Sequence, residues 1–323
     1  MKGIFFWLFL SAVFVALIGA YSRGFPGTNA PAKAGVPDSD DVVERLRTHV
    51  EYLALDVGTR DKPGPVQDAG DYLERELRRS GRDVKSTSSG GAMTIVSEVL
   101  GTKYPREVVI LASHFDGPRS SPGANSGASG AAVLVEVARQ LTGAGHERTL
   151  RFVLFPDGFK RRGDPDSAAA AYAKECQGRG ETIAAVLYLD SVGLFEDKDS
   201  QIYPFPFMFA LPARADFLAV VGAYQCRDLT AKTTELMRKN SGINIEGAIL
   251  PSFAPGTAFS PHAAFWDIGA PAVVLSDTGT WRSARFGSPS DTHDRLDYSR
   301  MARVVAGVTR TLGALVKKAT LSV

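Results

Sequence analysis

The chain has 323 residues, of which 44% are hydrophobic and 22% are charged, and its formal net charge is +2. This composition supports one large globular domain with a full core and excludes disordered and fibrous proteins. Because the net charge is so close to zero, no nucleic-acid partner is expected.

The chain opens with an uncharged apolar segment, residues 3–20. As a helix, this segment would span about 27 Å, close to the thickness of a bilayer core. A cleaved signal peptide has a shorter apolar region and a cleavage site of small residues, which Ile18-Gly19-Ala20 matches poorly. Residues 1–22 are therefore predicted to be an uncleaved membrane anchor, with a cleaved signal as the alternative. The rest of the chain is expected outside the cytoplasm, in the periplasm or the extracellular space.

Residues 23–40 are rich in proline, glycine and alanine and are predicted to form a flexible linker before a domain over residues 41–323. The chain has only two cysteines, Cys176 and Cys226, which excludes a disulfide-built scaffold. They can form one disulfide in an oxidising compartment or remain two buried thiols.

Helical periodicity and continuous apolar runs alternate along this domain. Helices are predicted at residues 41–55, 65–80, 127–141, 166–176, 229–239 and 298–317. Strands are predicted at residues 93–100, 107–114, 150–155, 184–189 and 271–275. The alternation predicts an α/β fold, a three-layer sandwich around a mixed, mainly parallel central sheet. Ligands bind at the carboxyl ends of such strands, and His114, Asp157 and Asp190 each follow one.

Six sequence blocks resemble metallopeptidase family 28, a family of two-zinc aminopeptidases, and they occur in that family's order. The blocks are residues 112–116 (ASHFD), 122–125 (PGAN), 152–155 (FVLF), 187–190 (LYLD), 265–272 (FWDIGAPA) and 289–298 (PSDTHDRLDY). The resemblance covers nearly all of the chain after the linker. It implies a zinc-aminopeptidase-like fold.

In that family a single carboxylate bridges two metals that activate water, and a glutamate moves the proton. The resemblance places the first metal at His114, Asp190 and the bridging position, which is Ser126 here instead of an aspartate. It places the second metal at the bridging position, a glutamate of a Glu-Glu pair and a late histidine. The late histidine position is Gly287.

The Glu-Glu pair falls on Gly158-Phe159 or on Phe159-Lys160, so the general base is absent in either alignment. The second site thus loses all its ligands, and the first keeps His114 and Asp190 alone. Since a catalytic zinc needs three protein ligands, zinc is not expected at full occupancy, and no other cofactor is expected.

Other residues near these positions can still lie in the cleft. They are Asp116, Asp157, Lys160, Asp164, His262 and His293. Asp116 corresponds to the family's residue that orients the metal-binding histidine. A cation from Lys160-Arg161-Arg162, or the protonated ring of His114, is predicted to pair with Asp190 or Asp116, because buried carboxylates need a partner. Ser126 is predicted to cap the helix that follows it.

The favoured function is a membrane-tethered pseudopeptidase. Such an ectodomain would bind a peptide or protein in the cleft that corresponds to the family's active site. The first alternative is an active hydrolase with a mononuclear or altered metal site, which bound metal would distinguish. A second alternative is a serine hydrolase that combines Ser126 or Ser129 with Asp267 and His293. The sequence lacks the Gly-x-Ser-x-Gly motif that this last chemistry uses in α/β-hydrolases.

Overall fold

The computed structural model describes residues 40–317, apart from residues 90–91, 144, 161, 165, 204–211 and 253–260. The apolar segment 3–20 and nearly all of the predicted linker lie outside the described residues. Within the described part of the chain, no helix is both long and apolar enough to cross a membrane.

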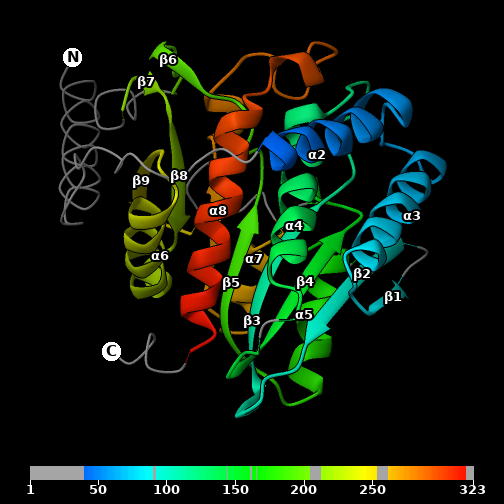
Figure 1. The fold of residues 1–323 in the computed structure, drawn as a ribbon, viewed down its shortest axis with the longest axis vertical. Coiled ribbons are helices and arrows are strands. Elements are labelled where there is room, and N and C mark those ends of the chain that lie inside the picture. Colours follow the sequence, from blue (N-terminus) through cyan, green and yellow to red (C-terminus); the bar gives the residue numbers. More distant parts are fainter. Residues whose placement is uncertain are drawn as a thin grey trace, which may run out of the picture.

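An eight-stranded sheet forms the middle layer of the fold (Figure 1). From edge to edge its strands are β1 (Val84–Ser89), β2 (Ala92–Val99), β4 (Arg148–Phe155), β3 (Tyr104–His114), β5 (Thr182–Leu189), β10 (Ala272–Ser276), β8 (Phe217–Gly222) and β9 (Asn244–Ile249). Strands β4, β3, β5 and β10 run parallel, whereas β8 pairs antiparallel with β10 and parallel with β9. Strands β1 and β2 complete the other edge in antiparallel pairs. A small separate sheet joins β6 (Glu196–Asp199) to β7 (Arg214–Ala215).

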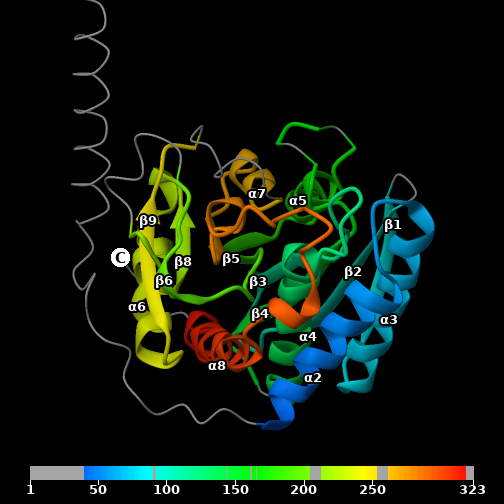
Figure 2. The ribbon, with the colours of Figure 1, turned by 90° about the horizontal axis from the view of Figure 1, so that it is seen from above.

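Helices cover both faces of the sheet, as Figure 2 shows along the strands. One face carries α2 (Asp40–Glu51), α3 (Pro63–Arg79), α4 (Ser129–Gln140), α6 (Arg227–Asn240) and α8 (Tyr298–Leu315). The opposite face carries α5 (Ala168–Gly178) and α7 (Ala263–Asp267). Because both faces are covered, every residue of β4 is buried, as the continuous apolar run predicted. The predicted three-layer α/β sandwich with a mixed sheet is confirmed.

The main differences from the predicted elements lie at the edges of the sheet and at the ends of two helices. Strands β1, β8 and β9 were not predicted, and the predicted helix 41–55 ends in a π-helical turn, η1 (Tyr52–Asp56). A second π-helical turn, η2 (Ala124–Ala128), precedes α4. Cys176 and Cys226 are both free and buried, so the disulfide alternative is wrong.

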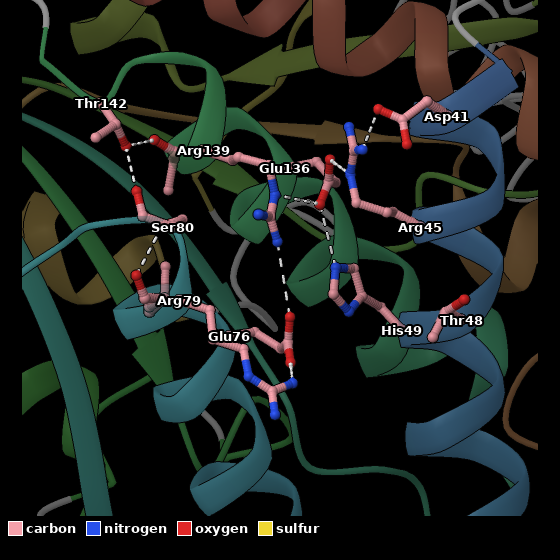
Figure 3. A network of polar contacts seen from close by, with 12 residues as sticks. Asp41, Arg45, Thr48, His49, Glu76, Arg79, Ser80, Glu136, Arg139 and Thr142 are labelled. Carbon is pink, nitrogen blue, oxygen red and sulfur yellow. Dashed lines mark hydrogen bonds and ion pairs between the residues drawn. The ribbon is translucent and has the colours of Figure 1, made fainter.

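A buried acid, Glu136, joins the helices of one layer (Figure 3). Its carboxylate accepts hydrogen bonds from Arg45 at 2.8 Å and from Arg139 at 3.2 Å, and it lies 3.2 Å from Nε2 of His49. The other ring nitrogen of His49 hydrogen-bonds to the Tyr72 hydroxyl at 2.7 Å. Helices α2, α3 and α4 are therefore tied together through one carboxylate.

Replacing Glu136 by glutamine should destabilise the fold in a pH-dependent manner. Burial opposes ionisation, but the hydrogen bonds from His49 and Arg45 outweigh it and lower the pKa of Glu136 below its ordinary value of 4.5. A carboxyl with a lowered pKa stabilises the folded state above the unfolded pKa, and this contribution is lost as the pH falls through the folded pKa. We expect Glu136→Gln to reduce the free energy of unfolding by about 1.5–3 kcal/mol at pH 7, with a smaller loss below pH 4.

Urea denaturation at the two pH values measures the difference. The exposed Glu235 of α6 provides the control, because Glu235→Gln should change the stability by less than about 0.5 kcal/mol. An equal loss for Glu136→Gln at both pH values would contradict the assignment of this carboxylate as ionised.

Candidate functional site

Two strand ends bring the central residues of the site together. His114 ends β3 and Asp190 follows β5, its parallel neighbour in the sheet. The Nδ1 atom of His114 lies 2.8 Å from Oδ1 of Asp116, and its Nε2 atom lies 3.6 Å from Oδ1 of Asp190. The prediction that the His114 ring lies within salt-bridge distance of these carboxylates is confirmed.

The position of this ring determines the charge of the site. Burial disfavours a charged imidazole, but the hydrogen bonds to Asp116 and Asp190 and the charges of both carboxylates raise the pKa of His114 to about 10. Both carboxylates thus favour the protonated form of the ring. The protein thus supplies a cation of its own between the two acids.

The basic loop does not supply this cation through Lys160 or Arg162. The Nζ atom of Lys160 lies 3.8 Å from Asp164, four residues further along the same loop. Arg162 forms an ion pair with Asp267 of α7 at 2.6 Å. Both side chains are thus paired with acids outside the site, and of the predicted alternatives it is the His114 ring that lies within reach of Asp116 and Asp190. Arg161 lies outside the described residues.

A fully buried arginine, Arg60, holds the loop that leads to Ser126. Its guanidinium donates hydrogen bonds to backbone carbonyls of Leu53, Gly58, Phe115, Pro122 and Gly123. The π-helical turn η1 leaves the Leu53 carbonyl available, because the amide of Val57 donates to Tyr52 instead. Burial lowers the pKa of Arg60 to about 10, which keeps the group charged at neutral pH.

Asp291 holds the other end of the same loop. Its carboxylate accepts hydrogen bonds from the amides of Asn125 at 2.8 Å and Ser126 at 3.2 Å. The Asn125 side chain in turn donates to Asp277 at 2.9 Å. Arg60 binds carbonyls and Asp291 binds amides, so one charged side chain holds each end of the loop. Neither role was predicted from the sequence.

Ser126 is not the helix cap that the sequence predicted. Helix α4 begins at Ser129, and Ser126 has non-helical backbone angles ahead of Gly127, whose φ is +100°. The Ser126 hydroxyl is buried and has no hydrogen-bond partner in the described part of the chain. The Ser129 hydroxyl donates to the Asn125 carbonyl at 2.6 Å and accepts from the Val192 amide at 3.0 Å.

Neither residue at the expected position of the general base supplies a carboxylate. Gly158 packs so tightly that an added Cβ atom would lie 2.0 Å from Cγ of His114, and its amide donates to Asp116 at 2.7 Å. Phe159 meets the His114 ring edge to face, with 5.2 Å between ring centroids. At Gly287, the late histidine position, φ is +67°, a conformation that favours glycine over other residues.

Two further candidate residues, Asp157 and His262, are buried near the site. Asp157 accepts a hydrogen bond from the amide of Ala168 at 2.7 Å and so supports the start of α5; burial raises its pKa to about 6. The buried His262 packs edge to face on Trp266 at 4.7 Å, and burial lowers its pKa to about 4. In the described structure neither of its ring nitrogens has a hydrogen-bond partner.

The serine hydrolase triad is not assembled. His293 pairs with Glu51 at 3.3 Å, while Asp267 is occupied by Arg162. The candidate nucleophiles Ser126 and Ser129 contact neither of them. This alternative is therefore wrong.

The donor set does not fit a pair of zinc ions. Among the described residues there is no group of three or more histidine, cysteine or acidic side chains that could hold a metal. His114 and Asp190 are 3.6 Å apart, near the separation of about 3.4 Å between two ligands of one tetrahedral zinc. The third position, Ser126, offers a neutral hydroxyl, which cannot bridge two dications as a carboxylate does.

A pocket of about 360 Å³ opens beside these residues. His114 and Asp190 form part of its lining, and the Asp190 side chain is 24% exposed. The rest of the wall is largely apolar and includes Phe159, Ala219, Val221, Leu250, Val274, Trp281 and Phe286. The pocket therefore combines an acidic side chain with a largely apolar wall, and its volume lies at the lower end of the range of about 300–1,000 Å³ that is typical of small-molecule sites.

Comparison with known proteins identifies the family. The sequence model of Peptidase family M28 matches residues 94–312. The chain belongs to peptidase family M28. It is also similar to YfbL of Escherichia coli (strain K12), described as an uncharacterized protein, with 30% identity over 288 residues that cover 83% of this chain and 87% of YfbL.

Solved structures of M28-type enzymes share the fold. The zinc aminopeptidase BSAP from Bacillus subtilis superposes with a TM-score of 0.64 at 13% identity, covering 89% of this chain and 98% of BSAP. The glutaminyl cyclase of Porphyromonas gingivalis gives a TM-score of 0.63 at 17% identity, covering 84% of this chain and 97% of the cyclase. The predicted zinc-aminopeptidase-like fold is confirmed.

A methyl group at position 158 should disturb the site directly. Because the added Cβ of Gly158→Ala would overlap the His114 ring, we expect a loss of about 1–3 kcal/mol in the free energy of unfolding. Gly178→Ala is the matched control, since no atom lies within 4 Å of the added Cβ there, and its effect should stay within about 0.5 kcal/mol. Equal stability of the two variants in thermal and urea unfolding would show that the ring is not held against Gly158.

Proposed function

We propose that this M28 protein is a membrane-tethered pseudopeptidase that binds an ammonium-bearing ligand, such as a peptide amino terminus, without cleaving it. The observation that carries the proposal is the donor set at the strand ends. Of the family's metal-binding positions, His114 and Asp190 still carry ligand side chains. Ser126, Gly287 and the residues at the Glu-Glu position, 158–160, offer no metal-binding side chain. A general base is worth about 10²–10⁴ in rate, and none occupies the family position.

The charge and shape of the pocket indicate the class of ligand. The two carboxylates that flank His114 favour a cationic group in the pocket that His114 and Asp190 help to line. Phe159, Trp281 and Phe286 offer an apolar wall beside it. Burying an apolar side chain there contributes about 25 cal/mol per Å². A peptide with a free amino terminus and an apolar first residue satisfies both requirements.

The active alternative is a hydrolase with a mononuclear metal site. The 3.6 Å separation of His114 and Asp190 favours it, since this distance suits two ligands of one zinc. Bound metal distinguishes the two functions.

Metal analysis after exposure to zinc and desalting should find well under one zinc per chain in the wild-type protein, because two protein donors hold zinc weakly. Ser126→Asp adds the missing carboxylate and should raise the content to about one zinc. Without metal this variant should be destabilised by its buried charge, and zinc at 100 times the dissociation constant should restore about 2.7 kcal/mol.

Ser126→Asn is the matched control, because it adds similar volume without charge and should gain no zinc. A stoichiometric zinc in the wild-type protein that His114→Ala releases would establish the mononuclear alternative and overturn the pseudopeptidase.

The tether and the location outside the cytoplasm rest on the apolar segment 3–20. We expect the full-length protein to stay in the membrane fraction after a carbonate wash, since a segment of this length can cross the bilayer core. Sequencing of the mature amino terminus provides the check. A terminus near Tyr21 in secreted material would instead identify a cleaved signal peptide.

A further inference from the structure

One face of the central sheet forms the floor of the pocket. Val274 and Ser276 of β10 pair with Val221 and Ala219 of β8, respectively, and all four residues line the pocket. They share a face because alternate residues of a strand point to the same side of a sheet. Their side chains are small or branched, which leaves room above the two strands for a ligand.

The acid of the pocket lies at one edge of this floor. Asp190 directly follows Leu189, which pairs with Leu275. Asp190 therefore lies beside Ser276, and Ser276 lies beside Ala219. Since neighbouring strands are about 4.8 Å apart, the backbones at Asp190 and Ala219 are separated by about 10 Å. This distance suits a phenylalanine whose ammonium group hydrogen-bonds to Asp190 and whose ring extends over the floor.

Aromatic side chains that are held by other parts of the chain also line the pocket. The carbonyl of Trp281 accepts a hydrogen bond from the amide of Ile202 at 2.7 Å, and its ring meets Tyr203 edge to face, with 5.6 Å between centroids. Phe286 packs against Gly279, where a Cβ atom would lie 3.0 Å from the Phe286 ring. Both rings are therefore fixed by contacts within the protein.

The turn that leads to Trp281 has a strained backbone. Thr278 lines the pocket with φ at +79°, a conformation that is disfavoured for a β-branched residue. Its carbonyl accepts a hydrogen bond from the Trp281 amide at 3.0 Å, and its hydroxyl donates to Gln201 at 3.2 Å. Such strain is concentrated at functional sites, where the surrounding structure maintains it. The strained turn thus supports the assignment of Trp281 to a binding site.

We infer that the pocket selects a ligand whose amino-terminal residue is aromatic, and that Ala219 limits the size of its ring. This inference rests on the proposed binding function and names the side chain that the ligand presents. An aromatic ring on the floor can pair with Trp281 and Phe286, and such pairs contribute binding energy beyond the apolar area that they bury. A side chain larger than alanine at position 219 would occupy the part of the floor that the ring needs.

Four hexapeptides with a fluorescent label at the carboxyl end test the inference with the full-length protein in detergent. They differ only at the first residue, which is phenylalanine, cyclohexylalanine, alanine or N-acetylated phenylalanine. In anisotropy titrations the phenylalanine peptide should bind about tenfold or more tightly than the alanine peptide. It should bind about two- to tenfold more tightly than the cyclohexylalanine peptide, whose ring has a similar size but is not aromatic.

Two substitutions in the floor test the size limit in opposite directions. Ala219→Leu should lower the ratio of the affinities for the phenylalanine and alanine peptides by about tenfold or more, because the added carbons compete with the ring. Val221→Ala enlarges the floor and should increase the affinity for a 2-naphthylalanine peptide relative to the phenylalanine peptide.

Ala231→Leu on α6 is the matched control for Ala219→Leu and should keep the wild-type ratio. Helix α6 packs on the other face of β8, since a Cβ atom at Gly222 would lie 2.1 Å from the Thr230 hydroxyl of that helix. Ala231 is not among the buried residues of α6.

Equal binding of the phenylalanine and alanine peptides would overturn the inference and leave the proposed binding of an ammonium group intact. Equal binding of the phenylalanine and cyclohexylalanine peptides would overturn the aromatic preference, and unchanged ratios in both floor variants would overturn the role of Ala219. If the acetylated peptide binds as tightly as the free one, the proposed function fails while the preference for a ring stands. If no peptide binds, both fail. Phenylalaninamide that competes as well as the peptide would support the inference with a free aromatic amine as the ligand.

Discussion

The imidazole of His114 lies between the carboxylates of Asp116 and Asp190, and the arrangement at the strand ends depends on this contact. Two carboxylates at the end of a buried parallel sheet repel each other unless a cation separates them. In the two-metal chemistry that the sequence resembles, metal ions supply that charge. In this chain the ring of His114 lies between the two acids, and their hydrogen bonds and charges raise its pKa.

The loop that would carry the bridging ligand is preserved for a similar reason. Arg60 binds the carbonyls of Pro122 and Gly123, and Asp291 binds the amides of Asn125 and Ser126. The positively charged Arg60 thus binds carbonyl oxygens, and the negatively charged Asp291 binds amide groups, of the same short segment. The scaffold of the site can therefore persist although the bridging side chain is a serine. This is why a single carboxylate at position 126 is expected to create a zinc site.

The sequence predicted the centre of the sheet better than its edges. Strands β3 and β4 contain the continuous apolar runs 108–112 and 152–155, which suit strands covered on both faces, and such runs are visible without a structure. Strand β1 consists mainly of lysine, serine and threonine, so its apolar pattern is too weak to detect. Its place in the sheet comes from pairing with β2.

In the site, too, residues at strand ends could be predicted from the sequence, whereas residues that act through contacts in the folded chain could not. His114 and Asp190 could be placed because each ends a recognisable strand. Arg60 could not, since its partners are backbone carbonyls from three separate segments and leave no trace in side-chain type. Lys160 was assigned to the site on proximity in the sequence, but a nearer acid on its own loop binds it. Ser126 failed as a helix cap because Gly127 turns the chain before the helix begins.

The charge on His114 is the central claim, and nitrogen NMR of protein labelled at its histidines measures it most directly. The two ring nitrogens of His114, assigned by comparison with His114→Ala, should both carry protons at pH 8, and Asp116→Asn should lower the pKa of the ring. A neutral His114 ring at pH 7 in the metal-free protein would contradict the claim that Asp116 and Asp190 keep this imidazole charged.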